Sequence, residues 1–230
     1  MTLEDLILFI DGEAIVIDKP AGLAVDAPRA GGDSVEARLD ELKLGFHRPP
    51  VPMHGLDRDT SGCLLLARNP KARARFQQAF ERGEVAKTYF AVVDGVIAGE
   101  DGLIDLPVAK RSSATRGWRM TVDEGGKAAR THWRRLAEVD GQTLVELQPE
   151  TGRTHQIRVH AARGLGAAIV GDPVYSRPDD NEEAAPMVLP DSGMLLHASR
   201  LVVPREPKTA LDVRSPLPER FGRWLDVLDG

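Results

Sequence analysis

A carboxylate in a polar turn and an arginine far along the chain are the features of this sequence that best suit chemistry. Asp57 lies in the run His54–Gly62, just before Thr60-Ser61-Gly62, a composition typical of a tight turn. Arg158 lies in the cationic and hydrogen-bonding run Gly152–His160. An ionised carboxylate can act as a nucleophile or base, and a nearby arginine favours the ionised form and fixes its orientation. We therefore expect a site that the fold assembles from distant parts of the chain.

Spacing alone leaves structural roles open for these residues. Asp57 and Asp59 also fit the role of a turn carboxylate that accepts backbone N–H groups, and on spacing alone we favour that role. Arg158 equally fits a surface helix arginine, or one that is paired to stabilise the fold. Tyr89 lies in an apolar strand. It suits either a core position with a satisfied hydroxyl or a platform on which a base stacks.

Other kinds of site find no support in the sequence. His155 and His160 are five positions apart, the wrong spacing for two ligands on one helix face, and no Glu-x-x-His pattern is present. The single Cys63 excludes an internal disulfide and is expected to be a small buried residue. Phosphate-loop, dinucleotide-binding and nucleophile-elbow motifs are absent. We therefore do not expect a metal site.

Composition is that of an ordinary globular protein, with 42% apolar and 28% charged residues among 230. We expect one domain over residues 1–230. The acidic start and the lack of a long apolar run predict a cytoplasmic protein that does not cross a membrane. The net charge of -5 argues mildly against nucleic-acid binding. However, basic residues gather at 110–135 and 153–163, so a polarised surface is compatible with the composition.

Hydrophobic patterns and turn signals predict several strands, joined mainly by hairpins. A hairpin over 6–18 turns at Asp11-Gly12, and a second hairpin turns at Asp140-Gly141. Further strands are expected at 63–67, 87–93, 129–138, 143–148 and 195–203. Glycine-rich residues 99–126 are expected to be irregular, and 175–192 to form a long polar loop.

Helices are predicted at four places. One is expected over 34–42, capped by Asp33 or Ser34, and a second over 70–82 with Asn69 as its cap. A third, over 155–163, would be capped by Thr151 or Thr154 and end at Gly164. The last is a C-terminal helix with an apolar stripe of Phe221, Trp224, Leu225 and Leu228. The helices are too few for a regular parallel series, so we expect a mixed α/β (α+β) fold with hairpin-joined strands.

Five segments resemble, in order, the RluA-type pseudouridine synthase family. Ile15–Leu23 is similar to its first motif, His54–Gly62 to the motif with the catalytic aspartate, and Lys87-Thr88-Tyr89 to the strand with its active-site tyrosine. Gly152–His160, running on to Gly171–Tyr175, resembles its third motif, and Leu196-His197-Ala198 a later shared element. Because five motifs occur in order over residues 7 to 203, a chance resemblance is improbable, and the functional roles become the favoured ones.

The resemblance implies an isomerase, free of metal and cofactor, that converts uridine in ribosomal or transfer RNA to pseudouridine. It implies a pseudouridine synthase fold with a central, mostly antiparallel mixed sheet and flanking helices and loops. Carried over by residue, Asp57 is the catalytic carboxylate, Tyr89 stacks on the target base, Arg158 pairs with Asp57, and Ile157 supports the site. Cleavage of the ribosyl–nitrogen bond develops positive charge on the sugar, which a carboxylate can stabilise or trap. The uridine must first leave its stack.

One position departs from the family pattern. Gly55 stands where the family motif normally has an arginine, which helps to fill the space left by the flipped nucleotide. This departure bears on RNA binding more than on the chemistry. We expect a stand-alone catalytic domain without an S4-type RNA-binding domain, acting as a monomer. RNA contacts are then expected from Arg58, Lys127, Arg153 and His155, with other basic residues of 110–135.

Two other functions remain open from the sequence. Gly55 and the acidic balance are compatible with a catalytically weak RNA-binding or folding factor that kept the fold, although such a protein needs no joint set of Asp57, Tyr89 and Arg158. A hydrolase that releases a base would need a second acid to activate water, and Asp59 is the nearest candidate in sequence. The products separate the three: isomerised RNA, unchanged RNA or abasic RNA.

Overall fold

The computed structural model describes residues 1–28, 31–113, 117–176 and 193–229. The predicted polar loop at 175–192 lies outside the described residues from 177 onward. The chain divides into two compact units, one of Met1–Lys87 with His197–Pro216 and one of Thr88–Leu196 with Leu217–Gly230. The expectation of a single domain over 1–230 therefore stays a prediction.

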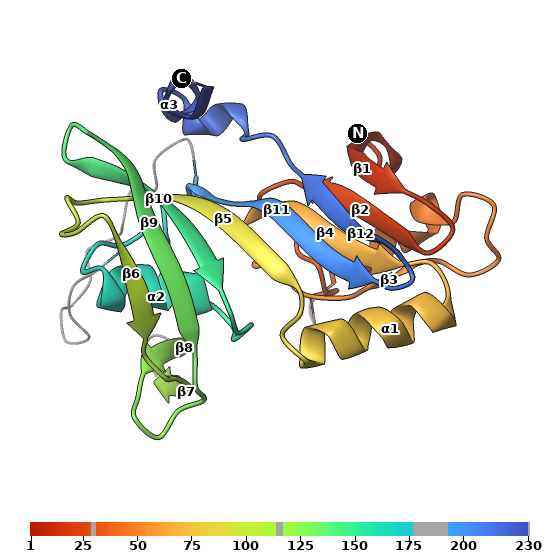
Figure 1. Cartoon of the computed structure of the whole chain (residues 1–230), viewed down its shortest axis with the longest axis horizontal. Coiled ribbons are helices and arrows are strands. Elements are labelled where there is room, and N and C mark those ends of the chain that lie inside the picture. The colour runs from red at the N-terminus through yellow and green to blue at the C-terminus, as the bar shows by residue number, and fades with distance from the viewer. Residues whose placement is uncertain (29–30, 114–116, 177–192, 230) are drawn as a thin grey trace. The chain divides into compact units, whose positions relative to one another are not determined.

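The first unit contains a mixed sheet in the order β1 (Ile7–Ile10), β2 (Ala14–Lys19), β4 (Ser61–Ala67) and β11 (Leu196–Arg205) (Figure 1). Two further strands join it: β3 (Val51–Pro52) pairs with β4, and β12 (Lys208–Arg214) pairs with β11. The predicted hairpin is confirmed, since Asp11 Oδ1 accepts the N–H groups of Glu13 and Ala14 at 2.8 and 2.9 Å. β4 runs parallel to β11, and its other neighbours are antiparallel.

Helices cover both faces of this sheet, which explains the continuous apolar run in β4. Phe76 of α1 (Pro70–Glu81) is buried with Val16 and Leu65 on one face. The 3-10 helices η1 (Glu4–Leu6) and η2 (Glu36–Leu42) border the opposite face, where Ile17 and Leu64 are buried. Every residue of β4 is buried, as its pattern predicted.

The local signals for the helices of this unit are largely confirmed. Asn69 Oδ1 accepts the N–H of Ala72 at 2.9 Å, and Pro70 stands in the first turn of α1. η2 is a 3-10 helix rather than an α-helix and begins two residues later than predicted. The residue at its N-cap is Val35, not the predicted Asp33 or Ser34, and it makes no side-chain cap. Ser34 Oγ, one residue earlier, still accepts the N–H of Ala37 at 3.1 Å.

The second unit contains an antiparallel sheet in the order β5 (Ala86–Val93), β10 (Gln142–Pro149), β9 (Arg130–Val139) and β6 (Asp101–Asp105). Asp140 and Gly141 join β9 to β10 with φ of 51° and 75°. Two successive left-handed residues are what a tight hairpin turn with the right twist requires. The predicted second hairpin is therefore confirmed.

The expectation that 99–126 is irregular is wrong. This stretch forms β6 and a separate hairpin of β7 (Val108–Ser113) and β8 (Gly117–Val122). Its glycines serve close contacts: a Cβ on Gly102 would lie 2.9 Å from Nε1 of Trp133, and one on Gly126 would lie 2.6 Å from the carbonyl carbon of Val108. At these two positions glycine reflects packing on other strands, not a lack of structure.

The predicted helix at 155–163 is α2 (Gln156–Gly164), which packs against the sheet through Gly164: a Cβ there would lie 2.6 Å from Ile104 Cγ2. The predicted threonine cap is wrong. The residue before α2 is His155, in the left-handed region at φ 52°, and no side chain caps the helix. Thr151 Oγ1 instead donates to Gln156 Oε1 at 2.7 Å. The same amide oxygen accepts the N–H of Arg153 at 3.1 Å and so closes the turn before the helix.

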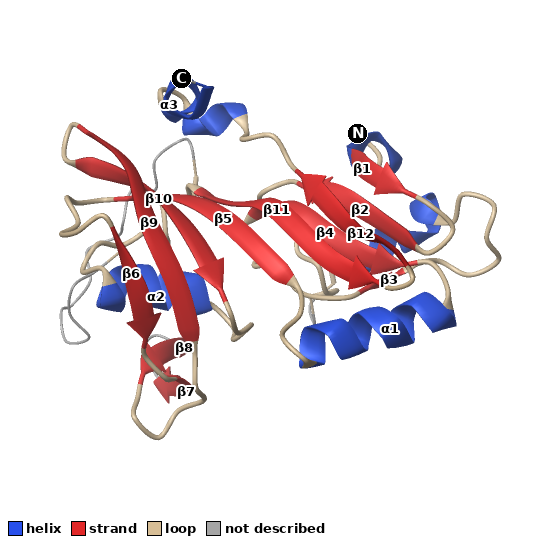
Figure 2. Ribbon diagram, viewed as in Figure 1, coloured by secondary structure: helices blue, strands red, loops and turns tan. Residues whose placement is uncertain are grey.

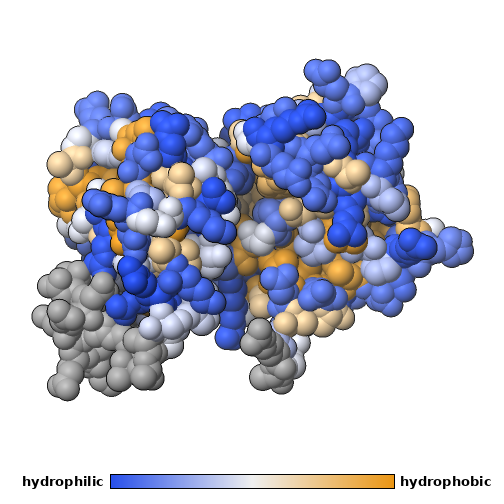
Figure 3. Space-filling view, turned by 90° about the horizontal axis from the view of Figure 1, so that it is seen from below, coloured by the Kyte–Doolittle hydropathy of each residue, from blue (hydrophilic) through white to orange (hydrophobic). Residues whose placement is uncertain are grey.

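The C-terminal segment forms η3 (Glu219–Phe221) and α3 (Trp224–Asp229). Phe221 and Trp224 are buried with Val92 and Leu144, as the predicted stripe requires, and Leu225 is half-buried. The side chain of Leu228 lies outside what the structure describes. Strands outnumber helices throughout (Figure 2), which agrees with the predicted mixed α/β class, and hydrophilic residues predominate on the face drawn in Figure 3.

Candidate active site

Asp57 lies in the turn that joins β3 to β4. The Thr60 N–H donates to the carbonyl oxygen of Asp57 at 3.1 Å, which closes the turn. Thr60 is buried, Asp57 and Asp59 are half-buried, and Arg58 is exposed. The turn therefore anchors its second half in the core and leaves its first half partly open to solvent, as a reactive carboxylate requires.

A buried lysine ties this turn to the first motif. Lys19 is fully buried, and its Nζ donates to the carbonyl oxygens of Pro20, Leu23 and Arg58 at 2.9, 2.7 and 3.1 Å. The Gly22 N–H donates to the same Arg58 oxygen at 2.9 Å, and Arg58 Nε donates back to the Gly22 oxygen at 3.0 Å. Three carbonyls satisfy the donors of a buried ammonium. The backbone beside Asp57 is thus fixed to residues 19–23.

The other end of the turn is fixed to β11. Ser61 Oγ lies 2.8 Å from Nδ1 of the buried His197, and His197 Nε2 lies 3.3 Å from the carbonyl oxygen of Ser215. Gly62 has φ +110°, and a Cβ there would lie 2.3 Å from the carbonyl oxygen of Ala198. Only glycine fits so close to a neighbouring strand. These contacts give Ser61, Gly62 and His197 structural roles in holding the turn.

His54, at the start of the motif, also has a structural role. Its Nε2 accepts the N–H of Leu65 at 3.1 Å, and its ring packs against Phe80 with centroids 5.3 Å apart. Burial lowers the pKa of His54 to about 4, with a smaller contribution from the charge of Lys87. The neutral ring is the form that can accept from Leu65, so the hydrogen bond and the lowered pKa agree.

We expect the protein to lose stability as the pH falls from about 6.5 toward 4. The unfolded His54 takes up a proton near its ordinary pKa of 6.5 while the folded residue does so only near 4, so acid favours unfolding between these values. The loss attributable to this one residue is about 2 to 3 kcal/mol. Urea unfolding of wild type and His54→Gln at several pH values measures it. An equal pH dependence in both proteins would contradict this role.

Arg158 is positioned by a carboxylate that sequence reasoning missed. It is buried in the first half of α2, and its Nε and Nη2 donate to Oδ2 and Oδ1 of Asp172 at 2.7 and 2.8 Å. Asp172 is fully buried and also accepts the N–H groups of Val174 and Tyr175 at 2.8 and 3.0 Å. The available signal was the run Gly171-Asp172-Pro173, typical of a turn closed by its aspartate.

The alternative of an arginine paired within the fold is thus realised by Asp172. The expected pairing of Arg158 with Asp57 stays a prediction, because the two residues belong to different units. Tyr89 lies in β5 opposite Leu147 of β10 and is 8% exposed, as is Ile157 beside Arg158. Their roles in base stacking and site support stay predictions as well.

Three of the predicted RNA contacts lie in the second unit, around the start of α2. Arg153 is exposed, and its Nε donates to the carbonyl oxygen of Ala128 at 3.1 Å. Lys127 is exposed, and its main chain pairs with Val108 of β7. His155 Nδ1 lies 2.8 Å from the hydroxyl of Tyr175. The fourth predicted contact, Arg58, belongs to the first unit.

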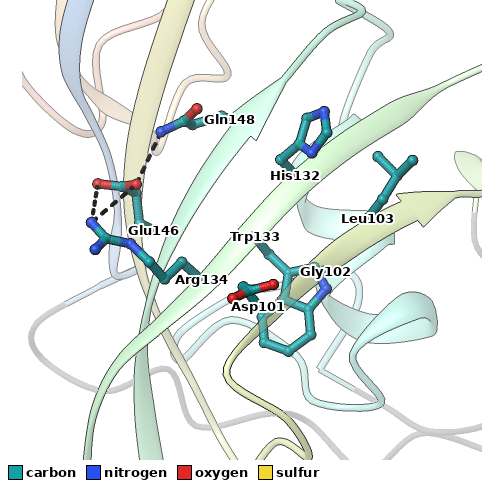
Figure 4. A pocket seen from close by; sticks show the side chains of 8 residues that line it. All are labelled: Asp101, Gly102, Leu103, His132, Trp133, Arg134, Glu146 and Gln148. Carbon is teal, nitrogen blue, oxygen red and sulfur yellow. Dashed lines mark hydrogen bonds and ion pairs between the residues drawn. The ribbon is translucent and has the colours of Figure 1, made fainter.

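A hollow of about 490 Å³ lies elsewhere, on the face formed by β6, β9 and β10 (Figure 4). Its polar groups pair with one another. Arg134 Nη2 of β9 lies 3.4 Å from Glu146 Oε2 of β10, and within β10 Gln148 Nε2 donates to Glu146 Oε1 at 3.0 Å. The lining residues are Asp101, Gly102, Leu103, His132, Trp133, Arg134, Glu146 and Gln148. None of these is a predicted site residue, and their mutual pairing is that of a solvated sheet face.

Among the described residues, no three His, Cys, Asp or Glu side chains gather in a way that could hold a metal ion. In that same part of the chain, no helix has both the length and the apolar character needed to cross a membrane. Burial raises the pKa of the Cys63 thiol to about 12, in keeping with the expected apolar role.

Known proteins similar to this chain define its class. The RNA pseudouridylate synthase family profile matches residues 13–163. An uncharacterised RNA pseudouridine synthase of Zymomonas mobilis is 51% identical over 216 residues, which cover 94% of each chain. Ribosomal large subunit pseudouridine synthase D of Nitrosomonas europaea is 34% identical, over 96% of this chain and 64% of its own length. The solved structure of human RNA pseudouridylate synthase domain containing 4 superposes with a TM-score of 0.77 at 27% identity, over 98% of this chain and 92% of that one.

The chain therefore belongs to the RNA pseudouridylate synthase family. It is an RNA pseudouridine synthase, an isomerase of the RluA type, and the predicted family and fold class are confirmed. The fold holds the motif around Asp57 by contacts from β2, β4 and β11, and it holds Arg158 by Asp172.

Proposed function

We propose that this enzyme isomerises specific uridines of ribosomal or transfer RNA, with Asp57 as the catalytic carboxylate. The observation that carries the proposal is the fixed turn. The fully buried Lys19 donates a hydrogen bond from its ammonium to the carbonyl oxygen of Arg58, the residue after Asp57. Such a clamp has a purpose if the position of one carboxylate matters, because a reacting group must be held within a fraction of an ångström. A protein that only bound RNA would not need it.

Arg158, Tyr89 and Ile157 are proposed to complete the site around the target base. Arg158 would favour the ionised form of Asp57 while it keeps its two hydrogen bonds to Asp172. Tyr89 would offer its ring to the freed uracil. Arg58, Lys127, Arg153 and His155 would contact the RNA. The sequence-based expectations of a monomer, of a cytoplasmic location and of one catalytic domain over 1–230 also stay predictions.

Large-subunit ribosomal RNA is the first substrate to test, because one relative that is 34% identical over nearly the whole chain is named for it. Transcripts of large-subunit RNA, small-subunit RNA and bulk transfer RNA would carry tritium at uracil C5, which is released when C5 forms the new bond to the sugar. Release from one pool identifies the substrate. Intact binding without release from any pool would favour the non-catalytic factor, and abasic sites would favour the hydrolase.

Replacing Gly55 by arginine is expected to tighten RNA binding. Gly55 is exposed, and a Cβ there would meet no atom within 4 Å, so the side chain that the family motif normally carries fits without strain. One added phosphate contact corresponds to about 1 kcal/mol, or about fivefold in affinity at moderate salt. Filter binding of Gly55→Arg and of the uncharged Gly55→Gln measures it. Equal affinities of the two variants would contradict an electrostatic contribution at this position.

A further inference from the structure

An exposed tryptophan lies next to the predicted site residues of the second unit. Trp118 of β8 is 48% exposed, although tryptophan is usually found largely buried. The ring of His155 lies against it, with centroids 5.2 Å apart and planes 31° apart. The ammonium of Lys110, from the paired strand β7, lies 4.7 Å from the centroid of its ring. Trp118 is thus an aromatic surface with a cation beside it.

Hydrogen bonds and apolar packing hold the strand that carries Trp118 against the start of α2. The Tyr175 hydroxyl accepts the N–H of Met120 at 3.0 Å and lies 2.8 Å from His155 Nδ1, so it ties β8 to the start of α2. Met120 and Val122 of the hairpin pack on a core that includes Val159 and Tyr175. An aromatic group that is fixed in advance loses little entropy when a flat ligand stacks on it.

The same contacts connect Trp118 to Arg158. The Arg158 guanidinium lies 5.0 Å from the centroid of the Tyr175 ring. The main-chain N–H of Tyr175 donates to the Asp172 carboxylate that holds Arg158. The path from Trp118 through His155 and Tyr175 to Arg158 is therefore one of direct contacts within a single unit. A nucleotide on Trp118 would thus be connected, through two packed side chains, to the arginine expected to serve the target uridine.

The surrounding charge is that of a surface for a polyanion. The described strands of the hairpin contain Lys110, Arg111 and Arg119 and no acidic residue, in a chain whose net charge is -5. Asp123, directly after the hairpin, pairs with Arg111. The exposed Lys127 and Arg153 lie at the base of this hairpin. Aromatic rings set among cations are how proteins bind unpaired nucleotides, since every base has a face that stacks.

We propose that Trp118 is a stacking platform for an unpaired base of the RNA substrate, with Lys110 moving from the indole to the adjacent phosphate. The proposal rests on the proposed function, since it assigns a binding residue for the same RNA. The base stacks on the exposed indole while His155 supports the ring. A single-stranded loop or bulge meets this requirement, whereas a fully paired helix keeps its bases stacked inside.

Binding of a short oligouridylate tests the platform without any need for turnover. We expect Trp118→Leu, which keeps an apolar side chain, to weaken binding about tenfold, and Trp118→Phe to stay within about threefold of wild type. Lys110→Ala should lower the slope of affinity against salt by about one phosphate contact. Phe46→Ala is the matched control, because Phe46 is 37% exposed and carries the Arg68 cation 4.0 Å from its ring, but lies in the other unit. It should bind like wild type.

Fluorescence gives a second, independent readout. Stacking of a base on Trp118 should quench the emission of wild type, and Trp118→Phe should bind the oligouridylate with this quenching largely lost. Equal affinity of Trp118→Leu and wild type, an equal loss in Phe46→Ala, or unchanged quenching in Trp118→Phe would each overturn the platform. A perfectly paired duplex should bind the two Trp118 variants and wild type alike. Because no step depends on tritium release, a failed platform remains distinguishable from a failed catalytic assignment.

Discussion

Asp57→Asn is expected to abolish pseudouridine formation, by at least about a thousandfold in turnover, while RNA binding stays within a fewfold of wild type. Asparagine has the same shape but cannot stabilise positive charge on the sugar or attack it. The turn should survive, because its closing hydrogen bond runs to the Asp57 main chain and the Lys19 clamp holds the neighbouring carbonyl. Tritium release from the substrate RNA, with binding measured on the same preparations, gives both quantities.

Asp59→Asn is the matched control for this experiment. Asp59 lies in the same turn, is half-buried like Asp57, and carries the same charge. If Asp57 is the catalytic carboxylate, Asp59→Asn should keep most of the activity. Retained turnover in Asp57→Asn would rule out Asp57 as the catalytic carboxylate. Loss of turnover in Asp59→Asn alone would assign that role to Asp59. Equal losses in both, with normal melting curves, would point to the charge of the turn rather than to one carboxylate.

The elements that sequence patterns predicted correctly are those fixed by neighbours in the chain. The cap at Asn69 and the hairpin turn at Asp140-Gly141 depend on a few successive residues, so their signals are complete in the sequence. The stretch 99–126 is structured although its glycines suggest otherwise, because some of these glycines are required by contacts with residues far along the chain. Gly102 makes room for Trp133, and Gly164 in α2 makes room for Ile104. Nothing local marks those contacts.

The candidate site divides in the same way. Asp57 and Arg158 could be singled out from residue type and resemblance. The groups that hold them could not, because Lys19 reaches Arg58 across the fold and Asp172 meets Arg158 only after α2 and the following turn are packed. A lysine before a Pro-Ala-Gly turn looks like a solvated residue in sequence. Its complete burial on three carbonyls is a property of the tertiary structure.

Replacement of Arg158 is expected to lower both the stability of the fold and the catalytic activity. In Arg158→Ala the fully buried Asp172 keeps the N–H groups of Val174 and Tyr175 but loses its cation. Removal of one partner of a buried pair costs about 3 to 5 kcal/mol, because the other charge remains without compensation. We expect a loss of that size in urea unfolding. Arg158→Lys should lose less, since it keeps the charge but not the two parallel hydrogen bonds.

Asp172→Asn separates the two roles. It removes the charge that holds Arg158 while the amide oxygen can still accept the turn's N–H groups, so its stability should also fall, and the double variant should show strong coupling between the two positions. If Arg158 acts on Asp57 as well, Arg158→Lys should lose turnover beyond what its folded fraction explains, whereas Asp172→Asn should stay much more active below its melting temperature. Full activity in folded Arg158→Ala would confine this arginine to holding the fold, and unchanged stability in Arg158→Ala would contradict the buried pair itself.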